Sequence, residues 1–175
     1  MRVFVTGKVA QLREAGAEPV VLDGLDREAV IAAVQAAAPD VILHEMTALA
    51  DMRGLRNMDK VFAATNELRT RGTDNLLEAA GRAGTRRVIA QGYTGWPNDR
   101  SGGPVKTEDD PLDPRPLKST LRSLAAIRHV EQVVPSAVPE RIVLRGSSNE
   151  KAKKEFGWEP RYASWGEGFR AWVSG

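Results

Sequence analysis

Short apolar segments alternate with amphipathic helical segments along most of this chain of 175 residues. Apolar and β-branched runs typical of buried strands occur at 2–5, 20–22, 41–43, 87–90 and 141–144. Apolar residues recur with helical spacing at 9–15, 26–38, 61–83 and 121–134, and shorter helical patterns follow at 150–156 and 165–173. Neighbouring parallel strands need long crossovers between them, so this alternation predicts an α/β fold. We expect a doubly wound parallel sheet with helices on both faces.

The residues that end the predicted strands form the candidate ligand site. Open parallel sheets bind ligands at the carboxyl ends of their strands, where successive loops meet. A nucleotide cofactor is therefore expected to contact the residues at these ends: Thr6, Gly7, Asp23, Gly24, Leu25, His44, Glu45, Met46 and Gln91.

The first predicted strand ends in Thr6-Gly7, which is typical of the entry to a nucleotide-binding turn. In such turns further glycines and a helix N-terminus hold a pyrophosphate through backbone N–H groups. Here Lys8 follows directly, and no second or third glycine stands where the phosphates need one. The sequence predicts a dinucleotide site from which the central part is missing.

Composition excludes several other classes of function. The net charge is +2 and the Lys and Arg residues are dispersed, which argues against a nucleic-acid partner. Without cysteine and with two histidines, the chain lacks the ligands of a typical zinc site, and we interpret the acidic run 108–110 as a solvated loop. No segment has the pattern of a signal peptide or a membrane span, so we expect a cytoplasmic protein with no metal and no membrane partner.

Five stretches, in the same order, carry a resemblance to a known family. They are VTG (5–7), VLDGLD (21–26), RGTDNLLEAA (71–80), KTEDDPL (106–112) and NEKAKKEFGWEP (149–160). Together they resemble the extended short-chain dehydrogenase/reductases, in the NAD-dependent epimerase/dehydratase branch. The resemblance implies a Rossmann-like fold that binds NAD or NADP, with Asp23 accepting a hydrogen bond from the adenine amine and Gly24 allowing close backbone approach. Asp23 as a simple cap of its turn is the alternative interpretation.

Two blocks of the family pattern have no counterpart in this chain. The glycine-rich turn, first helix and second strand are missing at 7/8, and most of the substrate-binding domain is missing near 145/146. We therefore assign 1–145 to a NAD(P)-binding Rossmann-like domain and 146–175 to the family's C-terminal helical tail. Either the printed sequence joins segments across omitted residues, or the protein has true internal deletions. We favour the first, because residues 8–17 are fewer than the dozen or so that a crossover needs.

The family's catalytic pair, Tyr-x-x-x-Lys on a helix, is absent. Ser123 and Ile127 stand at the corresponding positions, and neither side chain can exchange a proton with a substrate as the Tyr does. Tyr93 and Thr94, just after the fourth predicted strand, are the candidate catalytic residues. The alternatives are a loop aromatic that packs on the sheet edge for Tyr93 and a plain loop residue for Thr94.

Two lysines are further candidates at the reacting end, and one arginine departs from the family pattern. Lys106 and Lys118 are candidates for a cation near the nicotinamide, with surface lysines as the alternative. Arg69 stands where the family has a helical Asn.

The resemblance favours an NAD(P)-dependent oxidoreductase or epimerase/dehydratase-like protein that acts on a small polar substrate, sugar-like or carbonyl. A non-catalytic NAD(P)-binding sensor or regulatory protein is the alternative, which the missing pair favours. NAD and NADP are not distinguished, because the strand that ends in the deciding residue is absent. A homodimer stays open.

Overall fold

The computed structural model describes residues 1–6, 9–14, 16–49, 58–93, 98–99, 101–102, 105–107, 110–137, 140–144, 150, 153–154, 157 and 159. Several sequence predictions fall outside these residues: those for Gly7, Thr94, the junctions at 7/8 and 145/146, and most of the tail.

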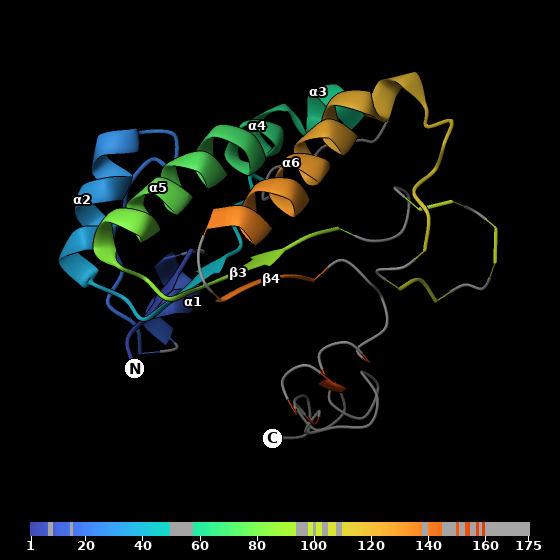
Figure 1. The fold of residues 1–175 in the computed structure, drawn as a ribbon. Helices are drawn as coiled ribbons and strands as arrows, with labels where there is room; N and C mark the ends of the chain where they lie inside the picture. Colours follow the sequence, from blue (N-terminus) through green and yellow to red (C-terminus); the bar gives the residue numbers. More distant parts are fainter. Residues whose placement is uncertain are drawn as a thin grey trace, which may run out of the picture.

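In the described part of the chain, a parallel sheet of four strands forms the centre of the fold (Figure 1). The strands are β1 (Val3–Val5), β2 (Val41–His44), β3 (Arg87–Gln91) and β4 (Glu140–Leu144), and they lie side by side in chain order. The register aligns Phe4 with Ile42, and Ile42 with Val88. The predicted parallel α/β sheet is therefore confirmed.

The helices follow the predicted alternation closely. They are α1 (Val9–Glu14), α2 (Arg27–Ala37), α3 (Met58–Val61), α4 (Ala63–Glu67), α5 (Thr73–Ala83) and α6 (Leu121–Ala137). A π-helical turn, η1 (Leu68–Gly72), joins α4 to α5, and a 3₁₀ turn, η2 (Lys118–Thr120), precedes α6. Because the strands follow one another in order and crossovers are right-handed, α2, α5 and α6 lie on the same face of the sheet (Figure 1). Within the described residues, these three helices cover one of the two faces on which helices were predicted.

The predicted strand at 20–22 is not a strand. These residues pair with no neighbour in the described sheet, and Val20 and Val21 are 59% and 79% exposed. A strand is stabilised by its ladder partners, and a short apolar run cannot supply them by itself. The segment instead leads from Gly16 to Asp26, whose Oδ1 accepts a hydrogen bond from Ala29 N and caps α2.

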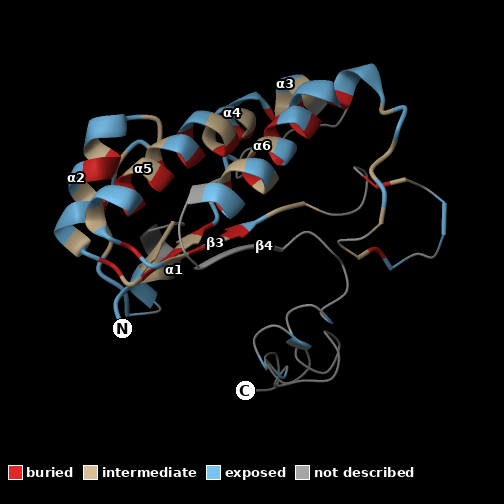
Figure 2. Ribbon diagram, in the orientation of Figure 1, coloured by how far each residue is buried: buried red, intermediate tan, exposed pale blue. Residues whose placement is uncertain are grey.

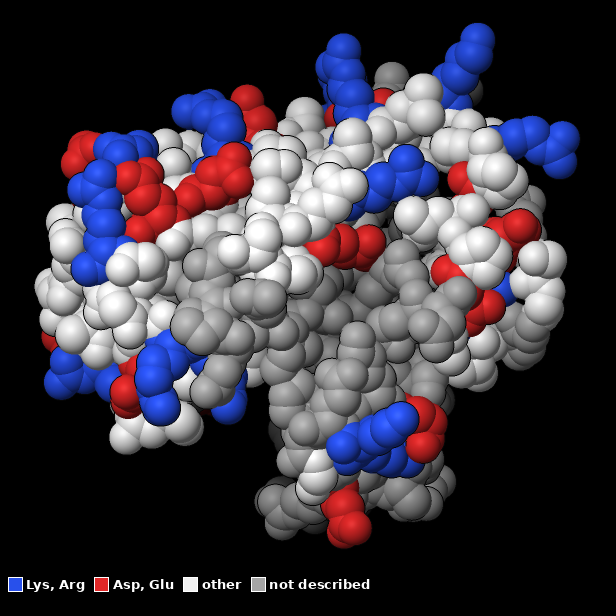
Figure 3. All heavy atoms as spheres, viewed as in Figure 1, with Lys and Arg blue, Asp and Glu red and all other residues white. Residues whose placement is uncertain are grey.

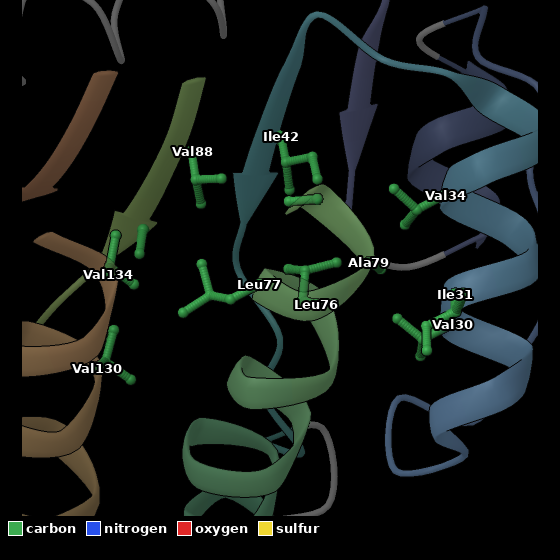
Figure 4. Close-up of a cluster of buried hydrophobic side chains, with 12 residues drawn as sticks. Val30, Ile31, Val34, Ile42, Leu76, Leu77, Ala79, Val88, Val130 and Val134 are labelled. Atoms are coloured by element: carbon green, nitrogen blue, oxygen red, sulfur yellow. The ribbon is translucent and has the colours of Figure 1, made fainter. Parts of the chain in front are cut away.

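The core lies between the sheet and the three long helices. Figure 4 shows side chains from both layers pointing toward one another, and Figure 2 shows the buried residues concentrated on the helix surfaces that face the strands. The labelled members are Val30, Ile31 and Val34 of α2, Leu76, Leu77 and Ala79 of α5, Val130 and Val134 of α6, and Ile42 and Val88 of the sheet.

Charged residues of both signs share the outer surface of α2 and α5 (Figure 3). Glu78 accepts hydrogen bonds from Arg27 on α2 and, at 2.7 Å, from Arg82 one turn further on α5. Exposed ion pairs of this kind contribute little to the free energy of unfolding. None of the helices in the described residues combines the length and apolar character needed to cross a membrane.

Candidate functional site

The carboxyl ends of β1 and β2 are held together by Thr6. Its backbone N donates to Leu43 O at 3.1 Å, which continues the ladder by one residue. Its Oγ1 accepts a hydrogen bond from Glu45 N at 2.7 Å. Two of the predicted cofactor contacts, Thr6 and Glu45, are therefore neighbours at the edge where the strands end.

The turn Asp23–Leu25 lies against the same edge. An ideal Cβ on Gly24 would stand 2.8 Å from Met46 Sδ and 3.2 Å from Leu68 Cδ2, so the glycine lets this turn pack closely on the residues after β2 and on η1. Asn75 Nδ2 donates to Gly24 O at 3.2 Å. In this structure, the groups that approach the backbone of Gly24 closely are the side chains of Met46 and Leu68.

Asp23 is exposed and uses half of its carboxylate inside its own turn. Oδ1 accepts a hydrogen bond from Leu25 N at 2.9 Å. Among the described residues, no group donates to Oδ2, which leaves one oxygen available to an outside donor. Asp23 can therefore cap its turn through Oδ1 and still accept a hydrogen bond through Oδ2.

His44, the last residue of β2, is buried and held at both ring nitrogens. Nε2 lies 2.7 Å from Thr73 Oγ1, which in turn lies 2.7 Å from Arg69 O. Because the carbonyl can only accept, Thr73 donates to it and His44 Nε2 donates to Thr73. Nδ1 then accepts from Met46 N at 3.4 Å. This neutral tautomer agrees with a pKa of His44 lowered to about 4, by burial first and by the charge of Arg69 second.

The π turn η1 brings Arg69 to this site. The helix predicted over 61–83 is one helical run over 63–83, in which residues 68–72 bond with π-helical spacing. Arg69 is 8% exposed, and its Cζ lies 5.7 Å from the centroid of the Tyr93 ring, within the range of a cation–π contact. Burial lowers the pKa of Arg69, and Tyr93 opposes that effect in part. Sequence reasoning did not select Arg69, although its departure from the family's Asn was a usable signal.

Gln91 and Tyr93 complete the site on the β3 side. Gln91 ends β3 and is exposed, whereas Tyr93 is half-buried beside Arg69. The Tyr93 ring therefore lies beside the helical turn η1, which carries Arg69.

Ser123 and Ile127, at the positions of the family's catalytic pair, are both buried. Ser123 is fully buried, its hydroxyl lies 3.1 Å from Asp59 Oδ1, and Asn66 Nδ2 donates to it at 3.0 Å. Asp59 also accepts from the backbone N of Ser123 and of Arg122, and so caps the first turn of α6. Ile127 is 3% exposed, within the packed side of α6.

Lys106, Lys118 and His129 each have described surroundings of their own. Lys106 Nζ donates to Ser101 O and lies 4.0 Å from Asp110 Oδ1, so the loop itself binds this ammonium group. Lys118 is exposed on η2. His129 bridges α6 to α5 through Asp74 Oδ1 at 2.7 Å. Within the described residues, no group of three or more His, Asp or Glu side chains could hold a metal ion.

Comparison with known proteins gives one curated relative and many structures. No family model matches the chain. A 3-diazoavenalumate denitrifying reductase from a Streptomyces species is 40% identical over 142 residues, which cover 78% of this chain and 46% of that protein. The chain thus spans about half the length of the curated relative that it matches.

The solved structures share the fold. UDP-glucose 4-epimerase from Brucella ovis in complex with NAD matches with a TM-score of 0.60 and 19% identity, over 82% of this chain and 43% of that one. A dTDP-4-dehydrorhamnose reductase from Clostridium acetobutylicum matches with a TM-score of 0.60 and 18% identity, over 90% and 59%. WbmG from Bordetella bronchiseptica in complex with NAD and UDP matches with a TM-score of 0.54 and 20% identity, over 83% and 52%. The Rossmann-like fold is therefore confirmed.

Proposed function

From the resemblance to the extended short-chain dehydrogenase/reductase family, which the sequence relative and the shared fold support, we propose that this chain is the nucleotide-binding part of an NAD(P)-dependent reductase. Its substrate is a small polar electrophile, of which a carbonyl, sugar-like or diazo compound are the classes to test. The sequence identity of 40% to a denitrifying reductase carries the proposal, because the matching solved structures share less than a quarter of their residues with this chain.

The described residues fit the adenine end of a nicotinamide dinucleotide. Asp23 offers its second carboxylate oxygen to the adenine amine, and the backbone of Gly24 and Leu25 forms the wall beside it. Thr6, Glu45 and the loop after β2 lie along the path toward the nicotinamide end. The turn that would hold the pyrophosphate, Gly7 and Lys8, lies outside the described residues.

Hydride from the reduced nicotinamide would be the reductant, and the chain's own residues would bind and orient the electrophile. Reduction of a carbonyl also needs a proton for the oxygen, and Tyr93 at the end of β3 is the candidate donor, with Thr94 as the second hydroxyl. Reduction of a diazo carbon needs the same two equivalents: a proton adds to the carbon, and hydride then replaces N₂ as the C–N bond breaks. His44 is committed to Thr73 and Met46, so it positions the site and does not exchange protons.

The decisive experiment titrates NADH and NADPH into the full chain and follows nicotinamide fluorescence. We expect saturable binding of at least one of them, and Asp23→Ala should weaken it by roughly tenfold, the loss of about one hydrogen bond to a charged group. Asp113→Ala is the matched control, because Asp113 Oδ1 caps an equivalent turn at Arg115 N, 2.8 Å away. No saturable binding by the wild-type chain would refute the proposal.

Turnover is tested with NADH and NADPH deuterated at the transferring position. Deuterium in the product of a carbonyl or diazo substrate, with N₂ release in the second case, supports the reductase.

A non-catalytic NAD(P)-binding sensor is the second candidate. The observation that favours it is the structural role of Ser123 and Ile127 where the family has its catalytic pair. Saturable binding without deuterium transfer to any substrate, and without epimerisation of nucleotide sugars, would favour the sensor.

A further inference from the structure

Arg69 is a buried cation without an anionic partner among the described residues. It is 8% exposed, and its guanidinium has one described contact, the ring face of Tyr93 at 5.7 Å. A buried charge is costly unless it is paired and hydrogen-bonded, and a cation–π contact supplies only part of the compensation. No described residue accepts a hydrogen bond from this guanidinium, which has five N–H donors.

Among the described residues, the groups around Arg69 carry no negative charge that pairs with it. His44 on β2 is neutral, and its ring is fixed by Thr73 and Met46. The Thr73 hydroxyl binds the carbonyl of Arg69 and not its side chain. One turn earlier, Asn66 donates to Ser123 and leaves its own buried Oδ1 without a partner. The described neighbours thus hold the backbone of Arg69 in place and do not pair with its charge.

We propose that Arg69 is the substrate-specificity residue of this site and binds the carboxylate of a small, planar organic acid. The inference rests on the proposed reductase function for the identity of the ligand as substrate. A guanidinium fork matches a carboxylate with two parallel hydrogen bonds, and the Tyr93 ring beside it offers a flat apolar surface. Two features of the ligand, its charge and its planarity, follow from these two side chains.

The position of Arg69 separates this carboxylate from the cofactor phosphates. Pyrophosphate belongs at the turn after β1, whereas Tyr93 follows β3, two strands away in the sheet. Adjacent strands are separated by about 4.8 Å, so these loops start about 10 Å apart. Arg69 therefore lies on the nicotinamide and substrate side of the strand ends.

The test compares 4-hydroxybenzoate with its neutral amide, 4-hydroxybenzamide, as NMR-observed ligands of the full chain. The wild-type chain should prefer the carboxylate, and Arg69→Gln should remove that preference with a loss of roughly 10- to 100-fold in carboxylate affinity, as expected for charge-assisted hydrogen bonds. Arg69→Lys should recover only part, because an ammonium lacks the planar fork. Arg71→Gln, an exposed arginine in the same π turn, is the matched control and should bind like wild type.

Three results would overturn the proposal. Equal wild-type affinity for the acid and the amide would do so without any variant, even if a variant fails to fold. Loss of ADP or inorganic phosphate binding by Arg69→Gln, with benzoate binding intact, would assign Arg69 to the cofactor. A lower melting temperature for Arg69→Gln, with benzoate affinity unchanged, would make Arg69 structural.

The same samples are titrated with NADH, so that the two proposals fail separately. Carboxylate preference without NADH binding leaves the anion site standing and refutes the reductase. NADH binding without carboxylate preference refutes the anion site at Arg69 and leaves the proposed reductase standing.

Discussion

His44 links the stability of the fold to pH, because the structure holds this side chain neutral. Burial, and to a smaller extent the charge of Arg69, lower its pKa from 6.5 to about 4. The unfolded chain has the ordinary pKa, so it binds a proton more readily than the folded chain between these values. The stability that neutral His44 contributes is therefore complete above about pH 6.5 and is lost as the pH falls toward about 4.

The magnitude follows from the two pKa values. Proton linkage between 6.5 and about 4 gives a loss in the free energy of unfolding of about 2 kcal/mol at about pH 5 and about 3 kcal/mol at about pH 4. His44 is 4% exposed, so solvent screens little of this effect. The partly exposed carboxylates of Asp40 and Glu78 have pKa values below the ordinary carboxyl pKa, so what they contribute to stability is lost only as the pH falls below that ordinary value.

The assay is urea unfolding followed by far-ultraviolet circular dichroism at several values between about pH 7.5 and about pH 5. His44→Gln keeps an amide donor for Thr73 but cannot titrate, so its unfolding free energy should vary less with pH by about 2 kcal/mol over this range. His129→Gln, which removes the other histidine of the chain, is the matched control. Parallel pH profiles for wild type and His44→Gln would refute the assignment of a neutral, buried His44.

Three further stability predictions use the same unfolding assay. Leu76→Ala, in the core at 1% exposure, should cost about 3 kcal/mol, whereas Leu117→Ala at 66% exposure should change stability by less than about 0.5 kcal/mol. Gly84→Ala should destabilise by about 1 kcal/mol because φ is +69° after α5, while Gly81→Ala, inside that helix with open space around its Cα, should stabilise by about 0.5 kcal/mol. Asp26→Ala should cost about 1 kcal/mol through the lost cap of α2, and equal stabilities of Asp26→Ala and Asp26→Asn would contradict it.

The elements that the sequence predicted well are those with a clear local period. The helix pattern at 26–38 became α2 over 27–37, and the pattern at 121–134 became α6 over 121–137. Each of these has a periodic apolar face and, for α2, a capping side chain that the chain itself encodes. The segment 20–22 has an equally apolar run but no ladder partner in the described sheet, and a partner is a property of the whole fold.

The candidate site was predictable in its location and not in its chemistry. Strand ends identified Thr6, Glu45 and Met46, and the structure brings them to one edge. The burial of Arg69 depends on a π turn, which no residue preference in the run LRTRG signals. The packing of Gly24 on Met46 likewise depends on contacts between distant segments.

The π turn η1 explains how one helical run contacts both α6 and the turn at Gly24. On its first half, Asn66 binds Ser123 of α6, and on its second half, Asn75 binds the turn at Gly24. An added residue in a helix rotates everything beyond it by about 100°, so η1 sets the angle between these two faces. The same rotation places Arg69 on the buried side beside Tyr93. The helix that the family resemblance identifies by its 71–80 motif is thus anchored on both sides, and Arg69 is held on its buried side beside Tyr93.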